Sequence, residues 1–176
     1  MLEKKQRKIY NGKKRVLYKI NKAKSLVKKM KEHNGKIFIE GNKHDLDELL
    51  EVVEILRSEN GCEWDRAQTH QTLKKCLIDE SQEVIDAIDK CDDQNLCEEL
   101  GDLLLQVLMN AQIAKERGVF DFEKVVQGLT DKLIRRHPHV FGDEQRPTTP
   151  EQSLALWKKV KETEKQRKSE RELKND

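Results

Sequence analysis

From Asp45 onward, apolar residues recur at the three- and four-residue spacing of amphipathic helices, and no later segment alternates convincingly as a strand does. Charged residues make up 39% of the 176 residues, whereas only 35% are hydrophobic. Such a mixture favours helices that bury one face and expose the rest. We therefore expect an all-α body. Its helices should run from Asp45 to a stop at Asn60-Gly61, from Thr69 or Thr72 to about Asp89, from about Leu96 to Arg117, from Asp121 to about His137, and onward from Thr149.

Basic residues are concentrated at the start of the chain. Residues 1–44 hold 15 Lys or Arg and 3 Asp or Glu, whereas the remainder holds 20 basic and 30 acidic residues. We interpret 1–44 as a basic N-terminal extension, 45–165 as the folded domain and 166–176 as a charged tail. The extension could contact nucleic acid or another polyanion, or it could be a mobile, solubilising segment or a remnant of a larger neighbouring domain.

Membrane insertion is not expected. No window approaches the roughly 18 apolar residues that a spanning helix needs. The N-terminal residues also lack the apolar core of a signal peptide. We therefore expect a cytoplasmic protein with no membrane contact.

The segment from about Leu96 to Arg117 is apolar on nearly every side. A helix of this kind is buried on several sides at once. In so small a domain, a second subunit is the simplest way to cover it, so we expect a homodimer or a higher homo-oligomer. The residues concerned are Leu100, Leu103, Leu104, Leu105, Val107, Leu108, Met109 and Ile113.

Four carboxylates lie within or beside the apolar faces of neighbouring expected helices. Glu80 and Glu83 are three residues apart on one helix, and Glu99 and Asp102 are three apart on the next. Residues at this spacing share one side of a helix. The short connection makes the two helices antiparallel neighbours, so the pairs can face each other.

A divalent cation would resolve the cost of burying these charges and their mutual repulsion. Ligands that are all oxygen favour Mg²⁺, with Mn²⁺ as a possible substitute. The alternative for either pair alone is solvated acids, which are common on charged helices. No Glu-x-x-His motif is present, which argues against a di-iron centre.

Two cations and two indoles are candidates for nucleotide contacts. Lys132 and Arg136 lie four residues apart on or beside an apolar face, where they could bind phosphate oxygens. The alternative is a structural salt bridge to acids of the two carboxylate-bearing helices. Trp157 and Trp64 could stack on a base, although Trp157 could equally be a core residue.

Five motifs follow one another in order within residues 45–160. They are Gly61-Cys62-Glu63-Trp64-Asp65, Gln68-Thr69-His70, Asp79-Glu80-Ser81-Gln82-Glu83, Glu98-Glu99-Leu100-Gly101-Asp102 and the block from Lys132 to Gly142. In order and spacing they resemble the MazG family of nucleoside triphosphate pyrophosphohydrolases. The resemblance implies an antiparallel bundle of the all-α pyrophosphohydrolase type, completed by dimerisation and dependent on Mg²⁺. It implies metal ligands at Glu80, Glu83, Glu99 and Asp102, and nucleotide contacts at Lys132, Arg136 and Trp157.

Two positions depart from the family pattern. Asp79 stands where Glu is usual, which would weaken a second-metal or water-positioning role there. Glu63 stands where Pro is common, which would loosen the loop that carries Trp64.

The sequence thus predicts metal-dependent hydrolysis of a nucleoside triphosphate to monophosphate and pyrophosphate, serving to clear unwanted nucleotides. Glu80, Glu83, Lys132 and Arg136 are the expected catalytic residues. Two other hypotheses remain open: a nucleic-acid-binding module that uses residues 1–44, and a nucleotide sensor without turnover.

Overall fold

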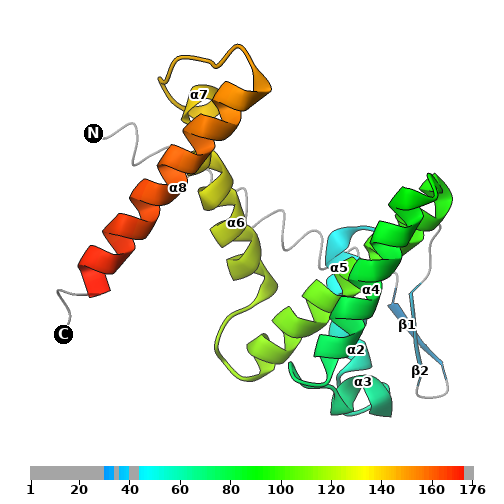
Figure 1. The fold of residues 1–176 in the computed structure, drawn as a ribbon. Helices are drawn as coiled ribbons and strands as arrows, with labels where there is room; N and C mark the ends of the chain where they lie inside the picture. Colours follow the sequence, from blue (N-terminus) through cyan, green and yellow to red (C-terminus); the bar gives the residue numbers. More distant parts are fainter. Residues whose placement is uncertain (1–29, 34–35, 40–43, 173–176) are drawn as a thin grey trace. The chain divides into compact units, whose positions relative to one another are not determined.

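The computed structural model describes residues 30–33, 36–39 and 44–172. The chain divides into two compact units between Ala67 and Gln68 (Figure 1). The first unit contains β1 (Met30–His33), β2 (Lys36–Ile39), α2 (Leu46–Leu56) and α3 (Glu63–Ala67). The second contains α4 (Leu73–Asp89), α5 (Asp93–Glu116), α6 (Phe122–Arg136), α7 (Pro138–Phe141) and α8 (Pro150–Glu172).

A short antiparallel hairpin precedes the helices. Strands β1 and β2 pair with Met30 opposite Ile39 and His33 opposite Lys36. The hairpin lies inside the stretch expected to be a basic extension, at the apolar alternation that begins with Ile37. The rest of that stretch, apart from His44, is outside the described residues, so its expected role stays a prediction.

Helix α2 begins where the sequence predicts, but it ends at Leu56 rather than at the expected stop at Asn60-Gly61. Asp45 caps its N-terminus, because the side chain accepts hydrogen bonds from the backbone N–H groups of Asp47 and Glu48. The segment after Gly61 was expected to be a loop, but residues 63–67 form the short helix α3. The two helices are held together where Arg57 Nη1 donates to the carbonyl of Asp65 at 2.5 Å.

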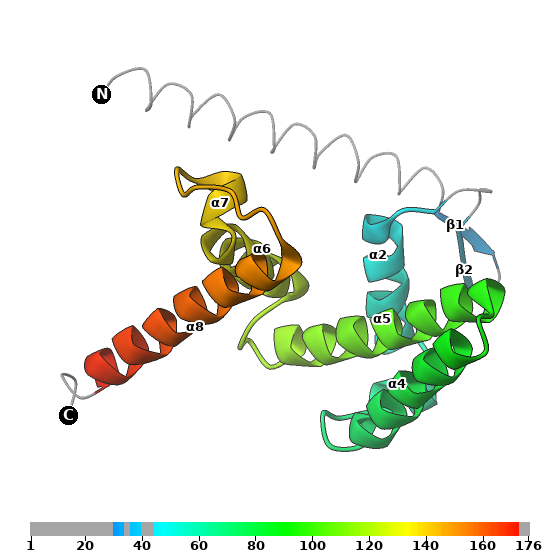
Figure 2. The same cartoon turned by 45° about the horizontal axis from the view of Figure 1, so that its top comes forward.

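Helices α4 and α5 form an antiparallel pair, which is the largest packing contact between helices of the second unit (Figure 2). They are joined by a tight turn in which Asp92 N donates to the carbonyl of Ala87 at 3.0 Å. The turn is shorter than expected, because α5 begins at Asp93 with Asp92 as its cap rather than at about Leu96. The Asp92 side chain accepts a hydrogen bond from Asn95 N at 3.0 Å.

The buried apolar residues of helix α5 lie between Leu108 and Ala114 and are at most 6% exposed. They are Leu108, Met109, Ala111, Ile113 and Ala114. Before them in the helix, Leu100 is 50% exposed and Val107 is 39% exposed. An apolar face is therefore left uncovered in the single chain.

Helix α6 continues through the short helix α7 to α8, which packs back against α6. The expected cap at Asp121 is confirmed, since its side chain accepts from Lys124 N at 2.8 Å. At the start of α8, Gln152 N donates to Thr149 Oγ1 at 3.3 Å as a capping box requires. The Gln152 side chain reaches back to the N–H of Thr148, one residue earlier than expected. Helix α8 runs on to Glu172, through most of the expected tail.

The body from Asp45 onward is all-α, as the sequence predicts. None of the helices described is both long enough and apolar enough to cross a membrane.

Candidate metal and nucleotide site

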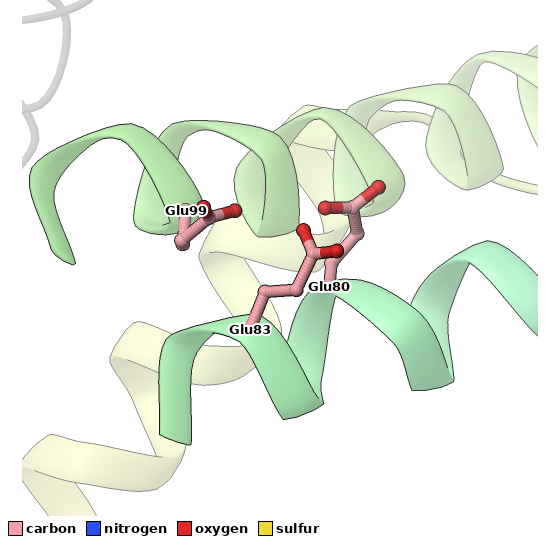
Figure 3. A group of neighbouring side chains, drawn as sticks. All are labelled: Glu80, Glu83 and Glu99. Carbon is pink, nitrogen blue, oxygen red and sulfur yellow. The ribbon is translucent and has the colours of Figure 1, made fainter. Parts of the chain in front are cut away.

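Three carboxylates meet between α4 and α5. Glu80 and Glu83 extend from one side of α4, and Glu99 extends from α5 towards them (Figure 3). One oxygen of each lies within 4.8 Å of the others. Glu80 and Glu83 therefore face Glu99 across the helix pair, because the antiparallel arrangement brings the second half of α4 beside the first half of α5.

The three acids differ in their contact with solvent. Glu83 is exposed, Glu80 is half-buried and Glu99 is 9% exposed. The Oε2 atom of Glu99 is buried and has no hydrogen-bond partner among the described residues. A buried acceptor without a donor costs about 1–3 kcal/mol, so the folded chain alone leaves this group unsatisfied.

The electrostatics of the cluster favour an added positive charge. Burial, followed by the charge and the hydrogen bond of Glu83, raises the pKa of Glu99 above its ordinary value. Burial, followed by the charges of Asp102 and Glu83, raises the pKa of Glu80. Asp102 is outside the three-carboxylate group but contributes to both shifts. Both raised pKa values mean that burial, and after it the neighbouring negative charges, disfavour the ionised carboxylates.

The residues fit a hard divalent cation. The candidate ligand atoms are all carboxylate oxygens from two helices, and one of the three acids, Glu99, has a buried Oε2 without a hydrogen-bond partner among the described residues. Mg²⁺ and Mn²⁺ prefer oxygen ligands of this kind. Glu80, Glu83 and Glu99 could hold the ion directly, with Asp102 adjacent to them.

A second cluster joins α6 to α8 around Trp157. The guanidinium carbon of Arg136 lies 5.3 Å from the centre of the Trp157 ring, and Lys161 Nζ lies 4.9 Å from it. Arg136 also donates to Glu164 Oε2 from Nε at 2.9 Å and from Nη2 at 2.8 Å. Trp157 therefore lies against two cations, which is the attractive cation–π arrangement.

The ion pair at Arg136 differs from the salt bridge considered from the sequence. Its partner is Glu164 on α8 rather than an acid of α4 or α5. Arg135, which helical geometry directs away from Arg136, joins the same carboxylate through Nε at 2.5 Å from Oε1. Lys132 is half-buried, and among the described residues it makes no recorded ion pair.

Sequence reasoning did not single out Lys161 or Glu164. Both lie on the Trp157 side of α8, at positions i+4 and i+7, which is the spacing of one helical face. That spacing was the available signal. It was obscured because the sequence after Val160 is polar or charged at nearly every position, so polarity does not distinguish one helical face from another.

Comparison with known proteins identifies the family. Residues 68–141 match the model described as the MazG nucleotide pyrophosphohydrolase domain. A crystal structure of a mazG-related protein from Thermotoga maritima is 32% identical with a TM-score of 0.55, and the match covers 66% of this chain and 99% of that chain. The chain belongs to the MazG nucleotide pyrophosphohydrolase family.

Longer MazG relatives are similar over the same region. The nucleoside triphosphate pyrophosphohydrolase/pyrophosphatase MazG of Thermotoga maritima is 53% identical over 122 residues, which are 69% of this chain and 46% of that protein. The nucleoside triphosphate pyrophosphohydrolase of Escherichia coli K12 is 42% identical over 134 residues, which are 76% of this chain and 51% of that protein. The chain thus spans about half the length of these curated relatives.

The structure shows the contacts and exposure of Glu63 and Asp79, the two residues that depart from the MazG pattern. Glu63 occupies the first turn of α3 and accepts from Arg66 Nη2 at 2.6 Å, which helps to hold a helix where a loose loop was expected. Asp79 is exposed, and its charge contributes to raising the pKa of Glu80. Trp64 belongs to the first unit and is 60% exposed, so its stacking role stays a prediction.

Proposed function

We propose that this MazG-family chain hydrolyses nucleoside triphosphates to the monophosphate and pyrophosphate, using Mg²⁺ held by Glu80, Glu83, Glu99 and Asp102. The observation that carries the proposal is the meeting of three carboxylate oxygens within 4.8 Å between α4 and α5. Relatives that match over this region carry the name nucleoside triphosphate pyrophosphohydrolase, which supports the same reaction here.

The chain's own residues have separate tasks in this reaction. When bound, Mg²⁺ supplies positive charge against the phosphates and activates a water. Glu80 or Glu83 orients the water by accepting a hydrogen bond from it. The water oxygen bonds to the α-phosphorus while the water gives up a proton to the solvent, the bond from that phosphorus to the bridging oxygen breaks, and pyrophosphate leaves with that oxygen.

Positive charge and aromatic faces complete the site. Lys132 and Arg136 neutralise charge on the phosphate oxygens, as preorganised cations do in phosphoryl transfer. Trp157 stacks on the base, a contact that tolerates any base because each has an aromatic face. The stacking role expected of Trp64 stays a prediction from the sequence. Broad base tolerance fits a role in clearing unwanted nucleotides.

The first experiment incubates the protein with each of the eight common nucleoside triphosphates, in Mg²⁺ and in EDTA, and resolves the products. We expect monophosphate and pyrophosphate in Mg²⁺ and neither in EDTA. Diphosphate with phosphate would show that the assigned bond is wrong. Binding without any product would favour a nucleotide sensor.

Variants test the carboxylates directly. Glu80→Gln and Asp102→Asn should each lower turnover by about a hundredfold or more. Each removes a charged ligand proposed for Mg²⁺, and the remaining ligands would then hold the ion in a different position. Glu98→Gln, an exposed acid on the same helix, is the matched control. Unchanged turnover and Mg²⁺ dependence in both ligand variants would reject the site.

We further propose that the chain works as a homodimer. Apolar residues of α4, α5 and α6 remain exposed in the single chain, including Ile78 at 67%, Leu100 at 50% and Leu129 at 49%. Large apolar side chains left exposed on three helices are surface that a second subunit would cover. Light scattering coupled to size exclusion should give twice the chain mass at micromolar concentration, and a monomer would contradict the proposal.

Mixed oligomers show which chain completes each site. Glu80→Gln and Arg136→Ala, each inactive alone, are combined after dissociation and reassembly. Restored turnover would mean that α4 and α5 of one chain work with α6 of another. No restoration would place all the residues of a site in one chain.

Residues 1–44 support a second, separate proposal of nucleic-acid contact, carried by their 15 basic residues against 3 acidic ones. Binding to RNA or DNA that falls steeply with salt and is unaffected by Glu83→Gln would support it.

A further inference from the structure

Glu164 is enclosed by two guanidinium groups. Its Oε1 accepts from Nε of Arg135 at 2.5 Å, and its Oε2 accepts from Nε and Nη2 of Arg136 at 2.9 and 2.8 Å. The side chain of Glu164 is 19% exposed and that of Arg136 is 18% exposed, whereas Arg135 is 53% exposed. This is a partly buried, multidentate pair, which is the geometry that fixes a guanidinium most firmly.

The carboxylate uses only part of each guanidinium. Among the described residues, the Nη1 group of Arg136 and both terminal nitrogens of Arg135 make no recorded hydrogen bond. Since Arg carries five N–H donors in a rigid fork, these outer donors can bind a second anion while Glu164 holds the inner edge. Glu164 therefore orients the forks and leaves donors for a ligand.

The same contact aligns the indole. The Arg136 guanidinium lies against the Trp157 ring, and Trp157 and Glu164 lie seven residues apart on one face of α8. Glu164 thus fixes Arg136 on α6 in register with Trp157 on α8. Glu164 would thus fix the separation between Arg136, a hydrogen-bond donor for phosphate, and Trp157, a stacking surface for a base, without itself contacting either part of the ligand.

We propose that Glu164 is a positioning residue for the triphosphate: it holds Arg136 and Arg135 so that their outer N–H groups bind phosphate oxygens beside Trp157. The inference rests on the proposed function for the identity of the ligand. A free Arg side chain samples many rotamers, and binding must otherwise overcome the entropy lost when one of them is fixed. Prior ordering by Glu164 removes much of that penalty before the nucleotide arrives.

Glu164→Gln is the direct test, because glutamine keeps the shape but removes the charge that binds two guanidinium groups. Glu162→Gln is the matched control, since Glu162 lies on the same helix, is 63% exposed and faces only Lys165 at 3.9 Å. Glu164→Asp keeps the charge on a shorter stem. Far-UV circular dichroism and thermal unfolding are recorded for each variant.

The first readout needs no turnover. In a Trp64→Phe background Trp157 is the one remaining tryptophan, so its fluorescence reports the α6–α8 cluster. Inorganic tripolyphosphate is titrated in EDTA. We expect Glu164→Gln to weaken binding by roughly tenfold, Glu164→Asp to lie between, and Glu162→Gln to match the parent.

The second readout is kinetic, in the protein that retains Trp64. Glu164→Gln should raise KM for the triphosphate by roughly tenfold while kcat changes less than threefold, because ordering of a binding group acts before the chemical step. A loss of fold would lower both quantities through the active fraction and would be seen in the circular dichroism.

Two results would overturn the inference. Tripolyphosphate binding in Glu164→Gln equal to that in Glu162→Gln would show that Glu164 only joins the helices. Tighter binding would show that Glu164 competes with phosphate. If the wild-type chain hydrolyses no triphosphate, the proposed function fails, but the fluorescence titration still decides the role of Glu164.

Discussion

His70 Nδ1 lies 2.8 Å from Asn110 Oδ1, so the segment before α4 is tied to the middle of α5. Asn110 Nδ2 donates to the carbonyl of Gln106 at 2.8 Å, which makes Oδ1 the acceptor and His70 Nδ1 the donor. The bond spans forty residues of sequence and holds together the helix pair that carries the carboxylates. It therefore links the stability of this pair to the geometry of the site.

His70→Phe should lower the free energy of unfolding by about 1–2 kcal/mol, because it keeps the ring volume but leaves Asn110 Oδ1 without its donor. For a chain of this size, that corresponds to about 2–8 °C in Tm. Thermal unfolding of His70→Phe, Asn110→Ala and the double variant gives the coupling energy. Strictly additive losses would contradict the bond.

Glu99→Gln should stabilise the chain in EDTA and destabilise it relative to wild type in Mg²⁺. The substitution removes one of several mutually repelling charges, and burial and Glu83 already raise the pKa of Glu99. With Mg²⁺ present, wild type gains binding free energy that the variant largely loses; this amounts to about 2.7 kcal/mol at a hundred times Kd. Thermal unfolding with and without the ion checks both signs. An equal shift in Mg²⁺ for both proteins would reject Glu99 as a ligand.

The same cluster predicts how stability depends on pH in EDTA. Because the pKa values of Glu80 and Glu99 are raised above 4.5 in the folded chain, the folded state binds more protons than the unfolded state just above that pH. Their contribution to the free energy of unfolding therefore falls as the pH rises from about 4.5 through the folded pKa values. Glu99→Gln should flatten this decline, as measured by urea unfolding at a series of pH values. An unchanged slope in the variant would contradict the raised pKa.

Glu164 changes the pH dependence of stability in the opposite direction to Glu80 and Glu99, and at lower pH. The hydrogen bond from Arg136 is the main cause that lowers the pKa of Glu164. Its contribution to stability is therefore present above the unfolded value of about 4.5 and is lost as the pH falls through the lower folded value. Glu164→Gln should remove that acid-side loss, as urea unfolding between pH 5 and 3 would show. The acid slope of Glu162→Gln should equal that of wild type.

Much of the helical body could be predicted from the sequence because its signals are local. Caps at Asp45 and Asp121 need only a side chain and the next three residues, and both are present as expected. The start of α5 was placed late because Asp92 to Asn95 are polar and look like a turn, although Asp92 is the cap of a helix already under way. Polarity alone does not separate a turn from a first helical turn.

The meeting of Glu80 and Glu83 with Glu99 could be predicted, because it follows from the helical periodicity of α4 and α5 and from the short turn between them. The Glu164 contact could not, since it depends on how α8 returns to α6 over the connection from α7, a distance of 28 residues from Arg136. Trp64 shows a different limit: its helix was unexpected because a five-residue helix has almost no periodicity. Local rules therefore predicted the meeting of Glu80, Glu83 and Glu99, whereas long-range packing decided the partners of the cations.

Gly61→Ala should destabilise the first unit. A Cβ at Gly61 would lie 2.3 Å from the carbonyl oxygens of Ile55 and Leu56, so the backbone would have to move. We expect a loss of about 1–3 kcal/mol. Gly128→Ala on α6 is the matched control, because its Cβ would meet nothing within 4 Å and alanine favours a helix by about 1 kcal/mol. Urea unfolding should give opposite signs for the two, and equal signs would contradict the close approach at Gly61.

Cys91→Gly should raise stability, although it removes a side chain. Cys91 follows α4 with φ of 53°, in the left-handed region, and it is exposed, so little packing is lost. A residue with a Cβ pays about 1–2 kcal/mol there that glycine does not. Cys97→Gly is the control, because Cys97 is also exposed but lies within α5, where glycine lowers helix stability by a few tenths of a kcal/mol. Both variants remove one exposed thiol, so a higher free energy of unfolding in both would assign the effect to the thiol. A higher value for Cys91→Gly together with a lower value for Cys97→Gly would assign it to the backbone conformation.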